Sequence, residues 1–143
     1  MSAINAAVQY HLKNAVTGVS PNFKIDYTKV QLSKDKGGLE NYGDAAIVPA
    51  AGANLNLTWD PAGAYSEEQQ LVRNLDRGVF LLYDETKNLS FYNVDNITRG
   101  QGKFTIHLPK IFVGSTLHSW FFFASADGKV SKSQYLGTTV ALA

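Results

Sequence analysis

Cysteine is absent from this sequence, which excludes disulfide bonds, thiolate nucleophiles, and zinc or iron–sulfur sites built on cysteine. No apolar run reaches the roughly 20 residues that a membrane-spanning helix needs. The first fifteen residues lack the charged start and apolar centre of a signal peptide, so the sequence leaves the compartment undetermined. Thirteen Lys and Arg against twelve Asp and Glu leave a net charge of +1. That balance argues against a binding surface for nucleic acid or an anionic membrane.

Motifs of common catalytic and nucleotide-binding sites are also missing. The sequence contains no HExxH, GxSxG, Walker or GxGxxG pattern. Its three histidines are His11, His107 and His118. No carboxylate stands at the spacing of a metal site or catalytic triad, so we expect surface or hydrogen-bonded histidines. We therefore predict that the protein is not an enzyme and holds no cofactor or metal.

One group of carboxylates offers an alternative to that prediction. Asp84, Glu85 and Asp95 flank a predicted hairpin and would form a calcium site if they met in space. Carboxylates are also common in turns, where water surrounds them. We favour solvated turn residues at these three positions.

The residues that are present predict one all-β domain. Hydrophobic residues make up 45% of 143, enough for a sizeable core. Short apolar runs separated by turn residues are typical of an antiparallel β-sandwich. The predicted strands are Phe23–Ser33, Ala45–Val48, Asn54–Trp59, Val79–Tyr83, Leu89–Val94, Phe104–Leu108, Leu117–Ala126 and a return strand after Gly128.

Two short helices interrupt this pattern. Ile4, Val8 and Leu12 repeat at helical spacing and predict an amphipathic helix over Ser2–Asn14. We expect residues 1–18 to form this helix and its end, packed on a sandwich of residues 19–143. A second helix is predicted over Glu67–Leu75, within the long connection Asp60–Arg77. Ser66 and Gln69 make a capping box at its start.

The C-terminal hairpin organises the predicted sandwich. Leu117–Ala126 is apolar on both faces, which is typical of a central strand covered on both sides. Asp127-Gly128 predicts a two-residue type I′ turn into the return strand. We expect the face of Trp120, Phe122 and Ala124 to meet the second sheet. Phe121 and Phe123 would then remain for the N-terminal helix or a partner.

Several segments resemble known families. LNLTWDP resembles the second strand of a fibronectin type III domain, and FTIHLPKIFVGSTLHSWFFFASADGKVSKSQYLG resembles its last three strands. The segments NAAVQYHLKNAVTG, PNFKIDYTKVQLS, LNLTWD and SADGKVSKSQYLGT are similar to a family of small bacterial proteins known only as a domain of unknown function. This resemblance implies an immunoglobulin-like or fibronectin type III-like sandwich and a further segment upstream of Met1. It implies no activity.

Two functions stay open at this point. The favoured one is a non-catalytic structural or protein-interaction module whose loops carry the contact. The alternative is a carbohydrate-binding module, because small sandwiches with exposed aromatic residues stack on sugar rings; a hydrolase lacks any supporting motif. Tyr65, Arg73 and Arg77 lie in or next to the predicted helical connection. We expect these three side chains to contact a protein or glycan partner.

Overall fold

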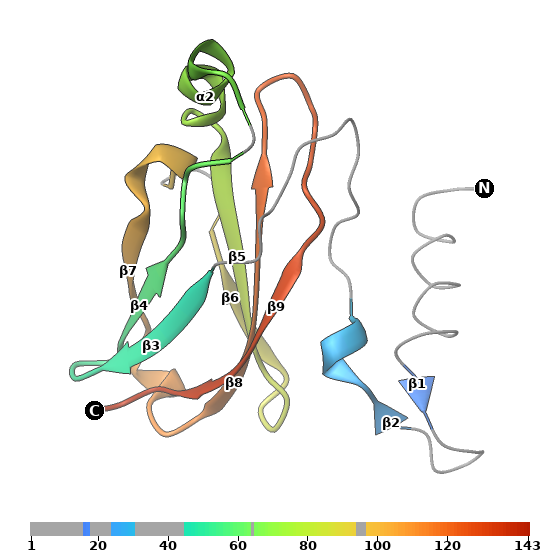
Figure 1. The fold of residues 1–143 in the computed structure, drawn as a ribbon. Coiled ribbons are helices and arrows are strands. Elements are labelled where there is room, and N and C mark those ends of the chain that lie inside the picture. The colour runs from blue at the N-terminus through green and yellow to red at the C-terminus, as the bar shows by residue number, and fades with distance from the viewer. Residues whose placement is uncertain (1–15, 18–23, 31–44, 64, 94–96) are drawn as a thin grey trace.

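The computed structural model describes residues 16–17, 24–30, 45–63, 65–93 and 97–143. The helix expected over Ser2–Asn14, and with it nearly all of the expected unit 1–18, lies outside these ranges. The described part is mostly β, with a three-stranded and a four-stranded antiparallel sheet that face each other (Figure 1). This is the arrangement expected of a β-sandwich.

The strands follow the predicted order along the chain. The three-stranded sheet has the order β3 (Ala46–Ala50), β4 (Asn54–Thr58) and β7 (Lys103–His107). The four-stranded sheet has the order β6 (Leu89–Tyr92), β5 (Arg77–Asp84), β8 (Thr116–Ala124) and β9 (Gln134–Val140). The remaining described elements are β1 (Val16–Thr17), β2 (Lys24–Ile25), the α-helix α2 (Glu67–Arg73), and the 3-10 turns η1 (Tyr27–Lys29), η2 (Arg99–Gln101) and η3 (Lys110–Phe112).

The core lies between the two sheets. On β4, Leu55 and Leu57 alternate inward and are fully buried, whereas Asn56 between them is exposed. They meet the inward side chains of the other sheet, including Phe80 and Leu82 of β5. Burying each large apolar side chain contributes about 1.5–3 kcal/mol, so this alternation holds the two layers together.

The central strand β8 is apolar and buried on both faces, but its expected orientation was wrong. Leu117, Phe121 and Phe123 point into the core between the sheets. Trp120 lies on the outer face, where it is only 2% exposed. Its indole N–H donates to the carbonyl oxygen of Val30 at 3.1 Å. A buried indole needs such an acceptor, and the chain next to η1 supplies it.

The first predicted strand, Phe23–Ser33, is also shorter than expected. Within its described part, β2 ends at Ile25 and η1 begins at Tyr27. The side chain of Asp26 accepts hydrogen bonds from the backbone N–H of Thr28 at 3.1 Å and from its hydroxyl at 2.6 Å. Such local bonds from Asp favour a turn over an extended strand.

The turn at Asp127-Gly128 differs from a two-residue type I′ turn, which needs positive φ at both residues. Only Gly128 has a positive φ, +88°. Its N–H donates to the Ser125 carbonyl at 3.2 Å, and the Ser125 N–H donates to the Lys129 carbonyl at 2.8 Å. The chain therefore reverses through three residues, with glycine in the left-handed position.

Candidate functional site

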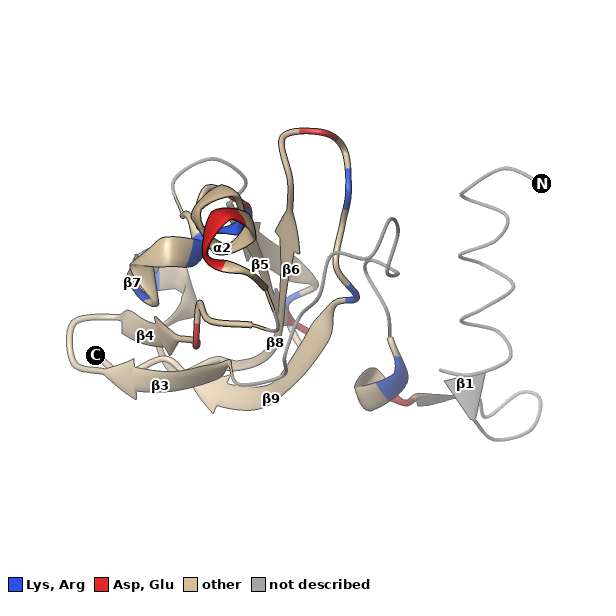
Figure 2. Cartoon of the chain, turned by 45° about the horizontal axis from the view of Figure 1, so that its top comes forward, with Lys and Arg blue, Asp and Glu red and all other residues tan. Residues whose placement is uncertain are grey.

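Helix α2 stands at one end of the sandwich, apart from the strands (top of Figure 1). Its capping box is as predicted: Gln69 N–H donates to Ser66 Oγ at 3.2 Å, and Ser66 N–H donates to Gln69 Oε1 at 3.0 Å. Glu67 and Glu68 occupy the first turn and Arg73 the last. These charges interact favourably with the helix dipole and stabilise the helix. Figure 2 shows this acidic start of the helix. The local sequence is therefore sufficient to start the helix.

The apolar side chains of α2 and the residues after it face solvent. Leu71 is 68% exposed, Val72 56% and Leu75 74%, and no residue of α2 is buried. Single exposed apolar residues are common, but three large ones within five positions form a patch. We call Leu71, Val72, Leu75 and the half-buried Tyr65 the α2 surface.

Two hollows border the α2 surface. One, of about 460 Å³, is lined by Tyr65, Glu67, Gln70 and Leu71. The other, of about 240 Å³, lies between the helix and the β8–β9 turn. Its lining residues are Val72, Arg73, Leu75, Asp76, Ala126 and Asp127. The patch thus includes recesses as well as protruding side chains, which suits a specific contact.

Contacts with the preceding connection hold the helix in place. The Gln70 side-chain amide donates to the Pro61 carbonyl at 2.7 Å and to Asn74 Oδ1 at 2.8 Å. Asn74 caps the end of the helix, and its carbonyl accepts from the N–H of Gly100 at 3.0 Å. The α2 surface is therefore carried on a fixed support rather than on a free loop.

A buried ion pair lies beneath the helix. Arg99 and Asp76 are both almost fully buried, and Arg99 Nε is 3.2 Å from Asp76 Oδ2. The guanidinium also lies over the ring of Phe123, 3.9 Å from its centroid, as in a cation–π contact. The indole N–H of Trp59 donates to the Arg99 carbonyl at 2.7 Å.

Burial dominates the electrostatics of this ion pair. Burial raises the pKa of Asp76, although Arg73 and Arg99 act to lower it. Arg73 Nε is 3.6 Å from Asp76 Oδ2, which ties the last turn of α2 to the pair. Sequence reasoning missed this arrangement, because Arg99 stands in a polar loop with two glycines, where an exposed arginine is the usual expectation.

The structure places the three expected contact residues differently. Tyr65 and Arg73 line the two hollows beside α2. Arg73 is mostly buried, because it pairs with Asp76. Arg77 is the exposed first residue of β5, opposite Ala124, and lines neither hollow. The exposed Leu71, Val72 and Leu75 form the larger part of the surface.

A second cluster of aromatic residues covers the outer face of the four-stranded sheet. Tyr27 stacks on the His118 ring with centroids 3.8 Å apart. His118 Nδ1 is 2.8 Å from the Tyr135 hydroxyl, and Trp120 lies 5.3 Å from the Tyr135 ring. His107, on the other sheet, is hydrogen-bonded to Asn54. The two described histidines are thus hydrogen-bonded, as predicted, and both tryptophans are buried.

The turn after β5 does not hold solvated carboxylates throughout. Asp84 is buried, and its Oδ1 accepts from the N–H groups of Thr86 at 3.0 Å and Lys87 at 3.2 Å. The Ser115 hydroxyl, followed by these N–H groups, holds the pKa of Asp84 below its usual range. The prediction that water surrounds Asp84 is therefore wrong, because this buried carboxylate accepts the backbone hydrogen bonds that order the turn. Asp95 lies outside the described residues, and no group of metal ligands occurs among those the structure describes.

No helix in the described part is long and apolar enough to cross a membrane.

Comparison with known proteins identifies a family but indicates no activity. A search of curated proteins found no match. The model of a family of unknown function (DUF6266) matches residues 1–137, nearly the whole chain. The chain therefore belongs to this family of unknown function.

Proposed function

We propose that this protein is a non-catalytic interaction module that binds a partner protein through the α2 surface. The supporting observation is the exposure of Leu71 and Val72 on a helix that is held at both ends, and of Leu75 directly after it. Exposed apolar patches beside recesses are typical of protein contacts. The helix contributes nothing to the core, so its apolar residues have no packing role within the described chain.

The scaffold is proposed to be of the fibronectin type III kind. Counted from β3, strands one, two and five form one sheet, and strands four, three, six and seven form the other. Fibronectin type III domains use this strand order, and the segment LNLTWDP falls on β4, the second strand. In such sandwiches the loops at the ends carry most contacts, and α2 occupies one end.

Charge indicates the kind of partner. Glu67 and Glu68 are exposed at the start of the helix, whereas Arg73 is paired with Asp76 and Asp127 with Lys129. The α2 surface is thus apolar at its centre and acidic at its edge. A partner with an apolar groove and a basic rim would complement it, as in helix-in-groove recognition.

Site-specific crosslinking in the native host tests this proposal. A photoreactive residue replaces Leu71, and in a second protein it replaces Val48, which is 57% exposed on β3 of the other sheet. We expect a discrete crosslinked species from position 71, absent from position 48 and lost when Leu75→Asp is added. Equal crosslinking at both positions, or no effect of Leu75→Asp in a folded protein, would contradict it.

The carbohydrate-binding alternative has less support. Sugar-binding sandwiches present flat aromatic rings to solvent, but Trp59 and Trp120 are both buried. Tyr65 is half-buried beside α2 and is the aromatic residue of the connection that a ligand would meet. Glycan-array binding that disappears on Tyr65→Ala would favour this alternative over a protein partner.

A further inference from the structure

We infer that the smaller hollow beside α2 is the anchor site of the α2 surface, where the partner protein inserts one uncharged apolar side chain, such as that of leucine. This role rests on the proposed function, because the partner is the protein that covers the α2 surface. Val72 and Leu75 belong to both the hollow and the α2 surface, so a partner that covers one also reaches the other. We call this hollow the α2 recess; its lining residues are Val72, Arg73, Leu75, Asp76, Ala126 and Asp127.

The size of the α2 recess suits one side chain rather than a free ligand. Its volume is about 240 Å³, which is below the roughly 300–1,000 Å³ of small-molecule sites. In protein interfaces, a few side chains that fill pockets near the centre of the contact supply most of the binding energy. A hollow of this size, bordered by an exposed apolar patch, has the form of the receiving side of such a contact.

Apolar side chains line the α2 recess from two elements. Val72 and Leu75 line it from the end of α2 and the residues directly after the helix, and Ala126 lines it from the β8–β9 turn. All three residues are exposed. An apolar side chain placed between them would remove apolar surface from water on both sides of the recess, which favours binding.

The charged residues in the lining already have ion-pair partners within the chain. Asp76 Oδ2 is 3.6 Å from Arg73 Nε and 3.2 Å from Arg99 Nε. Asp127 Oδ2 is 3.8 Å from Lys129 Nζ. A charged partner side chain would lose its hydration and compete with these pairs, whereas an apolar side chain does neither. The lining therefore favours an uncharged apolar occupant.

Hydrogen bonds hold both sides of the α2 recess before a partner binds. The Ser125 N–H donates to the Lys129 carbonyl at 2.8 Å, and the Lys129 N–H donates to Ser125 Oγ at 3.0 Å, which closes the β8–β9 turn. The Ser125 hydroxyl donates to Asp127 Oδ1. On the helix side, the Asp76 N–H donates to the Arg73 carbonyl at 2.9 Å. A recess that is already formed loses less conformational entropy on binding.

Titration of the full chain with amino-acid amides, followed by residue-resolved NMR, tests the chemistry of the α2 recess. The probes are the N-acetyl methylamides of leucine, lysine and glutamate, which differ only in their side chains. We expect the leucine probe to shift the resonances of Val72 and Ala126 at concentrations where the two charged probes shift neither. Equal or larger shifts with a charged probe, or no shift of these residues with the leucine probe, would overturn the anchor role.

A variant that fills the α2 recess tests its role in partner binding. Ala126→Phe would extend a ring into the recess that Ala126 lines, and it is combined with the photoreactive residue at position 71 described above. We expect the crosslinked species in the native host to fall by about tenfold or more, as for the loss of a central contact.

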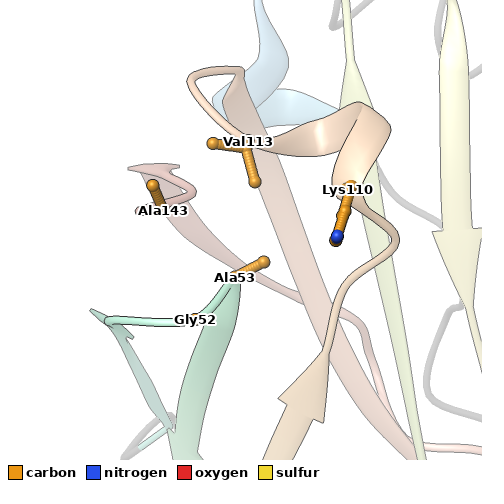
Figure 3. Close-up of a pocket in the computed structure, with 5 residues that line it drawn as sticks. All are labelled: Gly52, Ala53, Lys110, Val113 and Ala143. Carbon is orange, nitrogen blue, oxygen red and sulfur yellow. The ribbon is translucent and has the colours of Figure 1, made fainter.

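The matched control is Ala51→Phe, which adds the same ring to an exposed alanine in the β3–β4 turn. Ala51 precedes Gly52, which lines another hollow at the opposite end of the sandwich together with Ala53, Lys110, Val113 and Ala143 (Figure 3). The control therefore also places a ring next to a hollow, but far from α2 (Figure 1). It should leave the crosslinking from position 71 unchanged.

The outcomes separate the anchor role from the proposed function. If position 71 gives no crosslink in the otherwise unchanged protein, the proposed function is wrong and the anchor role falls with it. If the crosslink forms and Ala126→Phe leaves it unchanged, or if Ala51→Phe weakens it equally, partner binding stands and the anchor role is overturned. Ala126 is exposed, so Ala126→Phe is expected to keep the native amide spectrum. If this variant fails to fold, the titration of the unchanged chain decides the result.

Discussion

Replacing Trp120 by alanine tests whether the chain around η1 is an integral layer of the protein. Trp120 is 2% exposed, but it lies outside the core between the two sheets. Its neighbours are the rings of Tyr27, 6.3 Å away, and Tyr135, 5.3 Å away. Its N–H also donates to the Val30 carbonyl. The segment that carries Tyr27 and Val30 therefore covers part of this side chain, together with Tyr135 of β9.

The expected cost follows from these contacts. Truncating a buried tryptophan to alanine costs about 3–5 kcal/mol, and total stability is about 5–15 kcal/mol. Trp120→Ala should therefore lower the free energy of unfolding by about 3–5 kcal/mol, a large fraction of the total. Trp120→Phe keeps a ring but loses the hydrogen bond to Val30, so it should cost less, with about 1 kcal/mol from that bond. Urea unfolding, followed by circular dichroism, measures both.

A double-mutant cycle isolates the contribution of the η1 segment. Because Tyr27 and Trp120 are in ring contact, Tyr27→Ala and Trp120→Phe should be non-additive by about 0.5 kcal/mol or more. Phe121→Leu, in the core on the other face of β8, serves as the control and should be additive with Tyr27→Ala. If Trp120→Ala unfolds within about 1 kcal/mol of the wild type, or if the Tyr27 cycle is additive, the reasoning fails.

The other predictions concern the two ends and the core. Arg99→Met removes one partner of the buried ion pair and should cost about 3–5 kcal/mol in urea unfolding, whereas Arg77→Met, at an exposed position, should change stability by less than about 0.5 kcal/mol. The pKa of Asp84 is lowered on folding, so its stabilisation is present above its ordinary pKa of about 4 and lost as the pH falls. A series of melting temperatures at decreasing pH should fall less steeply for Asp84→Asn than for the wild type. Gly78→Ala would place Cβ 2.6 Å from Ile97 Cγ2 and should cost about 1–3 kcal/mol by overpacking; an unchanged melting temperature would contradict the close packing there. Leu75→Asp should leave thermal stability unchanged within about 0.5 kcal/mol, because Leu75 is exposed.

Local sequence patterns were sufficient for most elements. The alternation of Leu55, Leu57 and Trp59 predicted a half-buried strand, and these three residues are buried on β4 or directly after it. The Ser66–Gln69 capping box located the start of α2. Both patterns depend on neighbours within four residues, which is why the sequence alone contained enough information.

Features that depend on contacts between distant parts of the chain could not be predicted from local sequence patterns. Both faces of β8 are apolar, so alternation could not decide which face meets the other sheet. The deciding contacts are made by Tyr27 and Val30, about ninety residues earlier in the chain. Arg99 presents the same difficulty, because its partner Asp76 is 23 positions away. The prediction of a two-residue turn at Asp127-Gly128 was wrong for another reason. The Asp-Gly dipeptide also suits a three-residue loop in which glycine is the last residue.

Burial distinguishes the apolar residues that the fold requires from those of the α2 surface. Exchanging the buried Phe121 for a polar residue would unfold the sandwich, because its ring is fully enclosed between the sheets. Leu71 and Val72 are under no such constraint, since α2 starts from its own capping box and is held by Gln70 and Asn74. Stability therefore does not account for two large apolar residues at these positions. Among the described residues, folding does not require this apolar patch, and this is the reason why we propose a partner protein that covers it.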